Sequence, residues 1–318
     1  MKADAAKPAQ AFISDIQRCC FDDGDGLRTT VFFKGCNLHC PWCHNPETIS
    51  ARPVLMYAAS RCVGCGVCAH NCKSGLPLPF GGETDCAAAE GCRGCLCPQD
   101  ALRVSGRKMT LKEIMSVIYE DIPFYRASGG GVTLSGGEPL LWPEMCGRIA
   151  KECRKMGIPV LLDTAGCVKR EVFAFVAPLT DMVYMDMKLL PKDYERVCGG
   201  AGDYEKNLDF LMEKNIPFVL RVPIIPGFSA DPGTAEAMAE YAKNRGIGAV
   251  HLLPFNPLAR SKYEQLGRKY PFTEGFMKES ELKRILDIWR RFCPETVLKN
   301  SKMRKKRLKK RAKTVKKQ

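Results

Sequence analysis

The chain has 318 residues, 45% of them hydrophobic, which is enough for a full buried core and roughly two domains. No segment approaches the run of about 18 apolar residues that a membrane span needs, and the first residues lack the apolar core of a signal peptide. We therefore expect a cytoplasmic protein with no membrane partner.

The formal net charge of +14 comes almost entirely from one end of the chain. Residues 299–318 contain twelve Lys or Arg and no acid, and without them the chain has 37 basic and 35 acidic residues. A basic segment of this kind can bind nucleic acid. The same composition is typical of a solvated, disordered end, which we favour. We therefore do not expect a nucleic-acid partner.

The first strand-like segment covers residues 29–33, a β-branched and aromatic run that leads into a cysteine-rich loop. Residues 54–104 are rich in Cys, Gly and Pro and have little periodicity. This composition predicts an insertion held by metal rather than by a large core. Regular alternation resumes at Thr110, where Thr110 and Glu113 form a capping-box signature ahead of a helical pattern.

Five further strand-like runs follow, separated by helical patterns. The strands are predicted at 131–135, 159–163, 182–186, 217–222 and 249–255, and the helices at 143–156, 204–214, 232–245 and 279–292, with a short last run at 296–298. Strands that alternate with helices predict parallel β/α units, whose ligand site lies at the carboxyl ends of the strands. A doubly wound sheet is one arrangement that satisfies this pattern.

Eighteen cysteines in a chain without secretion signals favour metal binding over disulfides. Eleven of them lie between Cys36 and Cys97. The other seven have no ligand spacing, and we interpret them as small packing residues. These seven are Cys19, Cys20, Cys146, Cys153, Cys167, Cys198 and Cys293.

The loop from Cys36 to Cys43 contains three thiols, Cys36, Cys40 and Cys43, with the spacing Cys-x3-Cys-x2-Cys. Thiolates suit iron–sulfur clusters, and a four-iron cluster held by three of them keeps one iron open for a small molecule. A zinc knuckle is the alternative, with His39 or His44 as the fourth ligand.

The insertion carries eight more cysteines. The first four follow the Cys-x2-Cys-x2-Cys-x3-Cys spacing of bacterial two-cluster ferredoxins, in which the fourth Cys of a run serves the other cluster. We therefore predict two four-iron clusters, with zinc ribbons as the alternative. One would be held by Cys62, Cys65, Cys68 and Cys97, and the other by Cys72, Cys86, Cys92 and Cys95.

The loop and its flanks resemble a known family. The stretches Asp-Gly-Asp-Gly-Leu-Arg-Thr at 23–29, Val-Phe-Phe-Lys-Gly-Cys at 31–36 and Cys-His-Asn-Pro-Glu at 43–47 look like the opening of a glycyl radical enzyme activating enzyme, in the radical S-adenosylmethionine (SAM) superfamily. The resemblance covers about residues 10–297. It implies an α/β fold: a partial (β/α)6 barrel with an inserted ferredoxin-like domain. The divisions would be 1–53, 54–105, 106–298 and a basic tail at 299–318.

The resemblance also implies a set of site residues. Cys36, Cys40 and Cys43 would hold the catalytic cluster, with Trp42 and His44 beside it. Gly136, Gly137 and Glu138 would hold the amino group of SAM. Asp163, Thr164, Asp186, Met187 and Lys188 would contact SAM or a monovalent cation near Asp163 and Asp186. Arg221 matches an arginine near the active site, and Asn256 stands where the family often has His.

The implied function is activation of a partner enzyme. The protein would cleave SAM reductively and abstract a hydrogen from a glycine of a glycyl radical enzyme, using three 4Fe–4S clusters and a flavodoxin or ferredoxin as electron donor. Two alternatives belong to other classes. The basic tail suggests a radical SAM enzyme that modifies RNA, and the insertion suggests a non-catalytic, ferredoxin-type electron carrier. A pure carrier would need neither the three-Cys loop nor residues 136–138.

Overall fold

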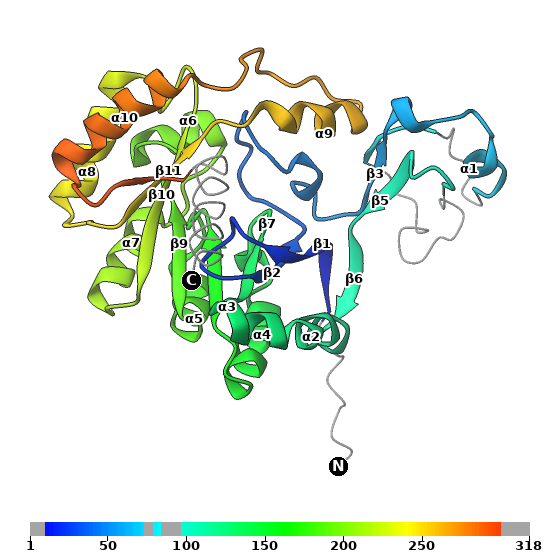
Figure 1. The fold of residues 1–318 in the computed structure, drawn as a ribbon, viewed down its shortest axis with the longest axis horizontal. Helices are drawn as coiled ribbons and strands as arrows, with labels where there is room; N and C mark the ends of the chain where they lie inside the picture. Colours follow the sequence, from blue (N-terminus) through cyan, green and yellow to red (C-terminus); the bar gives the residue numbers. More distant parts are fainter. Residues whose placement is uncertain (1–9, 73–78, 84–96, 300–318) are drawn as a thin grey trace, which may run out of the picture.

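The structure, a computed structural model, describes residues 10–72, 79–83 and 97–299. Cys86, Cys92, Cys95 and nearly all of the basic tail, whose described part is Lys299, lie outside these residues. The fold is a curved sheet covered by helices, with a smaller sheet at one side (Figure 1).

Nine strands form the large sheet, in the order β12-β11-β10-β9-β8-β7-β2-β1-β6. Their bounds are β1 Gln10–Cys20, β2 Arg28–Phe33, β6 Arg107–Thr110, β7 Gly131–Gly136, β8 Val160–Thr164, β9 Met182–Asp186, β10 Phe218–Ile224, β11 Val250–Pro254 and β12 Val297–Leu298. From β2 to β12 all neighbouring strands are parallel. The six predicted strands are therefore confirmed, and so is their parallel arrangement.

The strand order decides between the two predicted architectures. Each parallel strand lies beside the next one in the chain, from β2 through β7, β8, β9 and β10 to β11. A doubly wound sheet reverses its strand order at a switch point, and this sheet does not. The molecule is therefore a partial barrel of six β/α units, extended by β12 at one edge and by β1 and β6 at the other.

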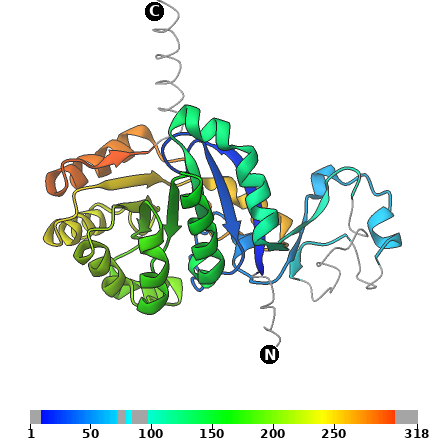
Figure 2. The ribbon, with the colours of Figure 1, turned by 90° about the horizontal axis from the view of Figure 1, so that it is seen from below.

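Helices follow the outer face of the curved sheet (Figures 1 and 2). Their bounds are α2 Leu111–Glu120, α3 Ile122–Ser128, α4 Pro143–Lys155, α5 Arg170–Val176, α6 Tyr194–Cys198, α7 Tyr204–Glu213, α8 Pro232–Asn244, α9 Arg260–Gln265 and α10 Glu279–Phe292; α1, Val67–His70, belongs to the smaller sheet's region. Short 3₁₀ helices cover Pro46–Thr48 (η1), Ala59–Arg61 (η2), Pro139–Leu141 (η5), Ala177–Leu179 (η6), Pro191–Asp193 (η7) and Pro257–Ala259 (η8). The four predicted helices are confirmed to within one residue, and the capping box of Thr110 and Glu113 is present.

Alternation along the strands separates a core face from a polar face. Leu134, Leu162, Val183, Leu220 and Leu252 are completely buried and belong to the core beneath the helices. Many residues of the opposite parity, which face the concave side, are polar. These include Thr133, Ser135, Asp163, Tyr184, Asp186, Arg221 and His251, which the strand register places side by side.

Two parts of the fold were not predicted. Strand β1 pairs antiparallel with β2, and β6 pairs antiparallel with β1; the outer half of β1 is mostly exposed, so it carries little hydrophobic pattern. The insertion also contains regular structure. Strands β3 (Val54–Tyr57), β4 (Gly82–Glu83) and β5 (Leu102–Ser105) form a three-stranded antiparallel sheet. Short strands of two to four residues leave almost no period to detect.

The interpretation of the seven unassigned cysteines holds for five of them, which are buried. It is wrong for Cys19 and Cys20 at the end of β1: Cys19 is exposed in the left-handed region, at φ 57°, and Cys20 is only partly buried. Among the described residues, no helix is both long and apolar enough to cross a membrane.

A buried carboxylate joins the antiparallel edge of the sheet to the helices. Asp121, which is 1% exposed, accepts hydrogen bonds from Arg18 on β1 and from the Thr29 hydroxyl on β2. Tyr125 on α3 donates to Thr29 in turn. Each of these groups satisfies a neighbour that is out of reach of bulk water.

We predict that Asp121→Ala lowers the free energy of unfolding by about 2–4 kcal/mol, because it leaves the Thr29 and Arg18 donors without their buried acceptor. Glu120→Ala is the matched control. Glu120 is 60% exposed and pairs with the same arginine, so its loss should cost less than about 1 kcal/mol. Denaturant titration of both variants measures the difference, and equal losses would contradict this role of Asp121.

Candidate functional site

The predicted site residues converge at the carboxyl ends of the parallel strands. The cysteine loop follows β2, residues 136–138 end β7, and Asp163 and Asp186 end β8 and β9. Arg221 lies on β10 in register with Asp186. Because parallel strands present their carboxyl ends at the same edge, segments far apart in the sequence meet here.

Backbone hydrogen bonds hold the cysteine loop. The Gly35 and Cys36 amides donate to the carbonyls of Thr48 and Ile49, at 2.7 and 3.0 Å, and so close the loop at its base. The Cys43 amide donates to the Cys40 carbonyl at 3.0 Å. The loop therefore presents Cys36, Cys40 and Cys43 from a fixed backbone.

The three thiols differ in environment. Burial raises the pKa of Cys36 to about 11 and that of Cys43 to about 12. A hydrogen bond from the Cys198 thiol lowers the pKa of Cys40 to about 7, and the Lys188 ammonium acts in the same direction. The Leu38 amide donates to the Cys36 sulfur at 3.5 Å. Backbone and side-chain donors of this kind stabilise thiolate ligands.

Cys198 is a residue that sequence reasoning missed as part of this site. It is completely buried, and its carbonyl accepts a 2.8 Å hydrogen bond from the His39 amide inside the loop. The side-chain amide of Asn37, also in the loop, donates a hydrogen bond to the Cys167 carbonyl at 2.5 Å. Cys198 lies more than 150 positions after Cys40, so no ligand spacing could have connected them.

The glycines at the end of β7 allow close backbone packing. Gly136 has φ 120°, and a Cβ there would lie 2.3 Å from the Phe33 amide nitrogen. A Cβ at Gly137 would lie 2.1 Å from the Gly35 carbonyl oxygen. Only glycine lets the end of β7 lie against the base of the cysteine loop.

Glu138 is completely buried and its oxygens are occupied within the protein. One oxygen accepts from the Leu140 amide at 3.1 Å and the Thr164 hydroxyl at 2.7 Å, and the other accepts from the Ala165 amide at 2.9 Å. Burial raises the pKa of Glu138 to about 7 against these donors. In this geometry the side chain joins the ends of β7 and β8, and the SAM contact predicted for it stays a prediction.

A row of alternating charges crosses β8, β9 and β10. Arg221 contacts Asp163 at 2.8 Å and lies 3.9 Å from Asp186, which forms a 2.8 Å ion pair with Lys188. Ser135 donates to the second oxygen of Asp163. Burial alone would lower the pKa of Lys188, but Asp186 and the thiols of the loop raise it well above its usual range. Lys188 thus stays charged between the carboxylates and the loop.

One oxygen in this row lacks a hydrogen-bond donor, although the Arg221 guanidinium lies 3.9 Å from it. The Oδ1 atom of Asp186 is buried and accepts no hydrogen bond from any described residue. A buried carboxylate oxygen of this kind is costly unless a donor or a cation reaches it. The row therefore fits a ligand that brings an ammonium group, a metal cation, or both.

The other predicted contacts occupy different places. The Trp42 ring packs on Phe228, with centroids 4.8 Å apart, and His44 is exposed. Met187 is completely buried in the core. The Asn256 side chain accepts from the Leu258 amide at 3.0 Å and caps η8. Met187 thus contributes to the core and the Asn256 oxygen to a helix cap, and the SAM contacts predicted for these two residues stay predictions.

Two further polar residues line the concave face and were not predicted. Tyr184 and His251 contact edge to face, with ring centroids 5.7 Å apart, and the Arg221 guanidinium lies 5.2 Å from the Tyr184 centroid. Burial lowers the pKa of His251 to about 4, so the imidazole is neutral near pH 7. Their strand parity with Asp163 and Arg221 is the signal that could have identified them.

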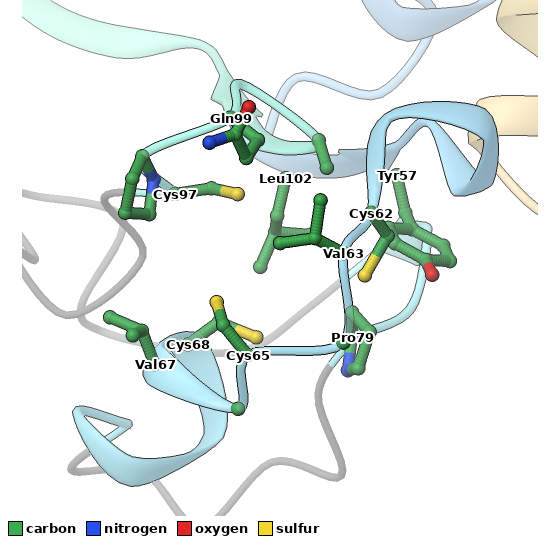
Figure 3. A pocket seen from close by; sticks show the side chains of 14 residues that line it. Tyr57, Cys62, Val63, Cys65, Val67, Cys68, Pro79, Cys97, Gln99 and Leu102 are labelled. Carbon is green, nitrogen blue, oxygen red and sulfur yellow. The ribbon is translucent and has the colours of Figure 1, made fainter.

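The insertion holds a second candidate site. A cavity of about 270 Å³ is surrounded by the side chains of Cys62, Cys65, Cys68 and Cys97 (Figure 3). Leu102 and Tyr57 complete its wall. These are the four cysteines that the ferredoxin spacing groups together. In the sequence, Cys97 is separated from the other three by segments that the structure does not describe, 73–78 and 84–96. Four thiols around one cavity suit an iron–sulfur cluster. Among the described residues, no three His, Cys, Asp or Glu side chains converge as ligands of a single metal ion.

Comparison with known proteins agrees with this arrangement. The radical SAM superfamily profile matches residues 86–242, and a 4Fe–4S single cluster domain profile matches residues 22–61, which contain the three-Cys loop. The indoleacetate decarboxylase activating enzyme of Tractidigestivibacter scatoligenes is 36% identical over 82% of this chain and 88% of its own length. The choline trimethylamine-lyase activating enzyme of Oleidesulfovibrio alaskensis is 35% identical over 87% and 94%.

The chain belongs to the glycyl radical enzyme activating enzymes. The predicted family is therefore confirmed, and the match of residues 22–61 to a 4Fe–4S domain replaces the zinc-knuckle interpretation of the loop in this activating enzyme. Among solved structures, Streptococcus suis SuiB bound to the precursor peptide SuiA covers 83% of this chain and 46% of its own, with a TM-score of 0.50 and 10% identity. That likeness supports the fold alone.

We predict that Glu138→Gln destabilises this activating enzyme by about 1–3 kcal/mol, because an amide NH₂ must then face the donors that now meet carboxylate oxygens. Glu144→Gln, at an exposed position on α4, is the control and should be neutral. Thermal unfolding of the cluster-loaded proteins compares the two. If Glu138→Gln left the unfolding temperature unchanged, the hydrogen bonds of this carboxylate would not stabilise the fold.

Proposed function

We propose that this activating enzyme cleaves SAM reductively and transfers the resulting radical to a glycine of a partner enzyme. One electron enters SAM, a carbon–sulfur bond breaks, and methionine and a 5′-deoxyadenosyl radical form. The radical takes a hydrogen atom from the glycine Cα, which yields 5′-deoxyadenosine and a glycyl radical. The observation that carries this proposal is the three-Cys loop, which lies against the charged row at the strand ends in a chain of this family.

The chain's own residues would divide the work. Cys36, Cys40 and Cys43 would hold a 4Fe–4S cluster, which supplies the electron and an open iron for the amino acid part of SAM. The charged row of Asp163, Asp186, Lys188 and Arg221 would surround that part, because both an ammonium and a carboxylate find opposite charges there.

We further propose a monovalent cation near Asp163 and Asp186. The Oδ1 atom of Asp186 supports it, since this oxygen is buried, accepts no hydrogen bond from any described residue, and has the Arg221 guanidinium no nearer than 3.9 Å. A bound cation would balance the negative charge of Asp163 and Asp186. The two carboxylates could then stay ionised beside the charged groups of SAM. Thr164 would act here through Glu138, to which its hydroxyl donates.

Loss of one loop thiol tests the main proposal. Cys40→Ala should abolish release of 5′-deoxyadenosine by anaerobic, reconstituted protein with a strong reductant. The substitution removes one of the three thiolates that would hold the cluster. Cys20→Ala is the control, since Cys20 lies at the end of β1 and should leave the yield unchanged. The measurement is 5′-deoxyadenosine by chromatography, and wild-type yield from Cys40→Ala would refute the proposal.

For the insertion we propose two 4Fe–4S clusters, in a ferredoxin-like domain over residues 54–105. The cavity among Cys62, Cys65, Cys68 and Cys97 supports one of them. The other would use Cys72 together with Cys86, Cys92 and Cys95, which lie outside the described residues. With a flavodoxin or ferredoxin as external donor, the protein would contain three clusters, or about twelve irons per chain.

Iron counting tests the cluster number. Cys65→Ala should lower the iron content from about twelve to about eight per chain, because Cys65 is a ligand of one insertion cluster only. The SAM-dependent spectroscopic change of the first cluster should persist. If wild-type protein instead contained about four irons per chain, with zinc in the remaining sites, the ferredoxin-like interpretation would be contradicted and only the first cluster would stand.

The partner would be a glycyl radical enzyme of the kind whose activating enzymes carry an insertion like this one. The two relatives reported above are named as activators of a decarboxylase and of a carbon–nitrogen lyase, and this chain would serve an enzyme of that broad group. Neither alternative has comparable support. An RNA-modifying enzyme rests on the basic tail alone, and an electron carrier leaves the charged row unexplained.

A further inference from the structure

Helix α9 lies between the cysteine loop and the insertion's sheet, and neither motif analysis nor the proposed function gives it a role. In Figure 1 it spans the region between the loop after β2 and strand β3. It contacts both η1, which follows Cys43, and β3. Its side chains make different kinds of contact at its two ends.

At one end, Lys262 reaches the segment that follows Cys43. Its ammonium donates to the Glu47 carboxylate at 2.6 Å and to the Asn45 side-chain oxygen at 2.7 Å, across more than 200 residues of sequence. Glu47 is only 8% exposed, and its second oxygen is buried without a partner. Lys262 therefore supplies the side-chain cation of a carboxylate that water cannot solvate.

The Glu47 segment is continuous with the base of the cysteine loop. The buried Lys34 ammonium donates to the Glu47 carbonyl at 2.5 Å. The next residue, Thr48, accepts from the Gly35 amide at 2.7 Å, and its hydroxyl donates to the Asn45 carbonyl, also at 2.7 Å. A displacement of Glu47 therefore moves hydrogen-bond partners on both sides of the loop, next to Cys36 and next to Cys43.

Aromatic residues of the same region anchor the helix in the core. Tyr263 on α9 and Tyr270 beyond it are 8% and 7% exposed, and their ring centroids lie 4.8 Å apart. Both rings belong to the main hydrophobic core. Helix α9 thus holds the segment after Cys43 through Lys262 and is itself anchored in the core through Tyr263.

At its other end, the helix supports the insertion. Leu266, directly after α9, packs against Val54 and Met56 of β3. The opposite face of β3 carries Leu55, which packs with the wall of the four-cysteine cavity. Gly81 lies so close to α9 that a Cβ there would be 1.7 Å from the Gln265 carbonyl oxygen. One strand therefore separates the insertion's cavity from the helix that holds the cysteine loop.

We propose that Lys262 is a positioning residue for Cys43, acting through Asn45 and Glu47, and that α9 couples this position to the insertion's sheet. The proposal rests on the proposed function, in that Cys43 is taken as a cluster ligand. Lys262 does not touch the reacting groups. It sets where the third thiol of the loop lies, and the packing of β3 and Gly81 on α9 sets where Lys262 lies.

The first experiment compares Lys262→Met, Lys262→Arg and Lys155→Met in full-length, anaerobically reconstituted protein. Lys155 forms an exposed ion pair on α4 and is the matched control. Two quantities are measured: the change that SAM causes in the electron paramagnetic resonance (EPR) spectrum of the reduced protein, and the rate of iron loss to a chelator.

Lys262→Met should alter the SAM-induced EPR change and speed iron loss at least threefold. Lys262→Arg keeps a cation that can reach both oxygens and should restore both readouts, and Lys155→Met should behave as wild type. If Lys262→Met lowers only the melting temperature and leaves both readouts unchanged, Lys262 is structural and the proposal is wrong. If wild-type protein itself shows no SAM-dependent EPR change, the proposed function fails instead.

A double-mutant cycle tests the route. In a Glu47→Gln background, Lys262→Met should have less than half of its effect on iron loss, because the interaction that transmits it is already broken. Full additivity of the two substitutions would overturn a route through Glu47, whatever the single variants do.

The second experiment tests the coupling to the insertion. Gly81→Ala forces the insertion away from Gln265, whereas Gly248→Ala adds the same methyl group where no atom lies within 4 Å. Hydrogen exchange, measured by mass spectrometry, should speed up in residues 43–49 as well as in β3 for Gly81→Ala only. Faster exchange confined to β3, or no change in either segment, would overturn the coupling.

Discussion

Arg221 is the group on which the polar face of the barrel depends. It lies between two carboxylates from neighbouring strands, Asp163 at 2.8 Å and Asp186 at 3.9 Å, and none of the three side chains is more than 20% exposed. Without that cation, two acids at adjacent strand ends would repel each other in a region of low dielectric constant. Lys188 completes the row from the other side of Asp186. The result is a site with fixed, nearly balanced charges at the edge where the cysteine loop begins.

The same edge shows how one motif serves both packing and chemistry. Gly136 and Gly137 permit backbone contact with β2 and the cysteine loop, and Glu138 ties β7 to β8 through three donors. These contacts place the loop and the strand ends in fixed relation before any ligand arrives. A site that must orient a reactive substrate benefits from such preorganisation, since the cost of ordering has been met during folding.

The antiparallel additions to the sheet extend this arrangement sideways. Strands β1 and β6 continue the sheet beyond β2, and the Asp121 network fixes that edge to α3. The insertion leaves the barrel after the cysteine loop and returns through β5 to β6. At the return, Gly106 lies against the side chain of Lys34, next to the base of the loop, and α9 contacts strand β3 of the insertion.

The sequence by itself determined the family, the six parallel strands, the principal helices and the three-Cys loop, because each depends on local periodicity or on a short spacing. It also grouped Cys97 with Cys62, Cys65 and Cys68.

The tertiary structure decided what depends on contacts between distant segments. These are the burial of Glu138 among its donors, the place of Cys198 beside Cys40, the inward face shared by Tyr184 and His251, and the contact of Lys262 with Glu47. The cap formed by the Asn256 oxygen and the burial of Met187 in the core also became visible only in the tertiary structure. Strand parity and residue spacing are properties of one segment, whereas a hydrogen bond across 200 residues exists only once the chain has folded.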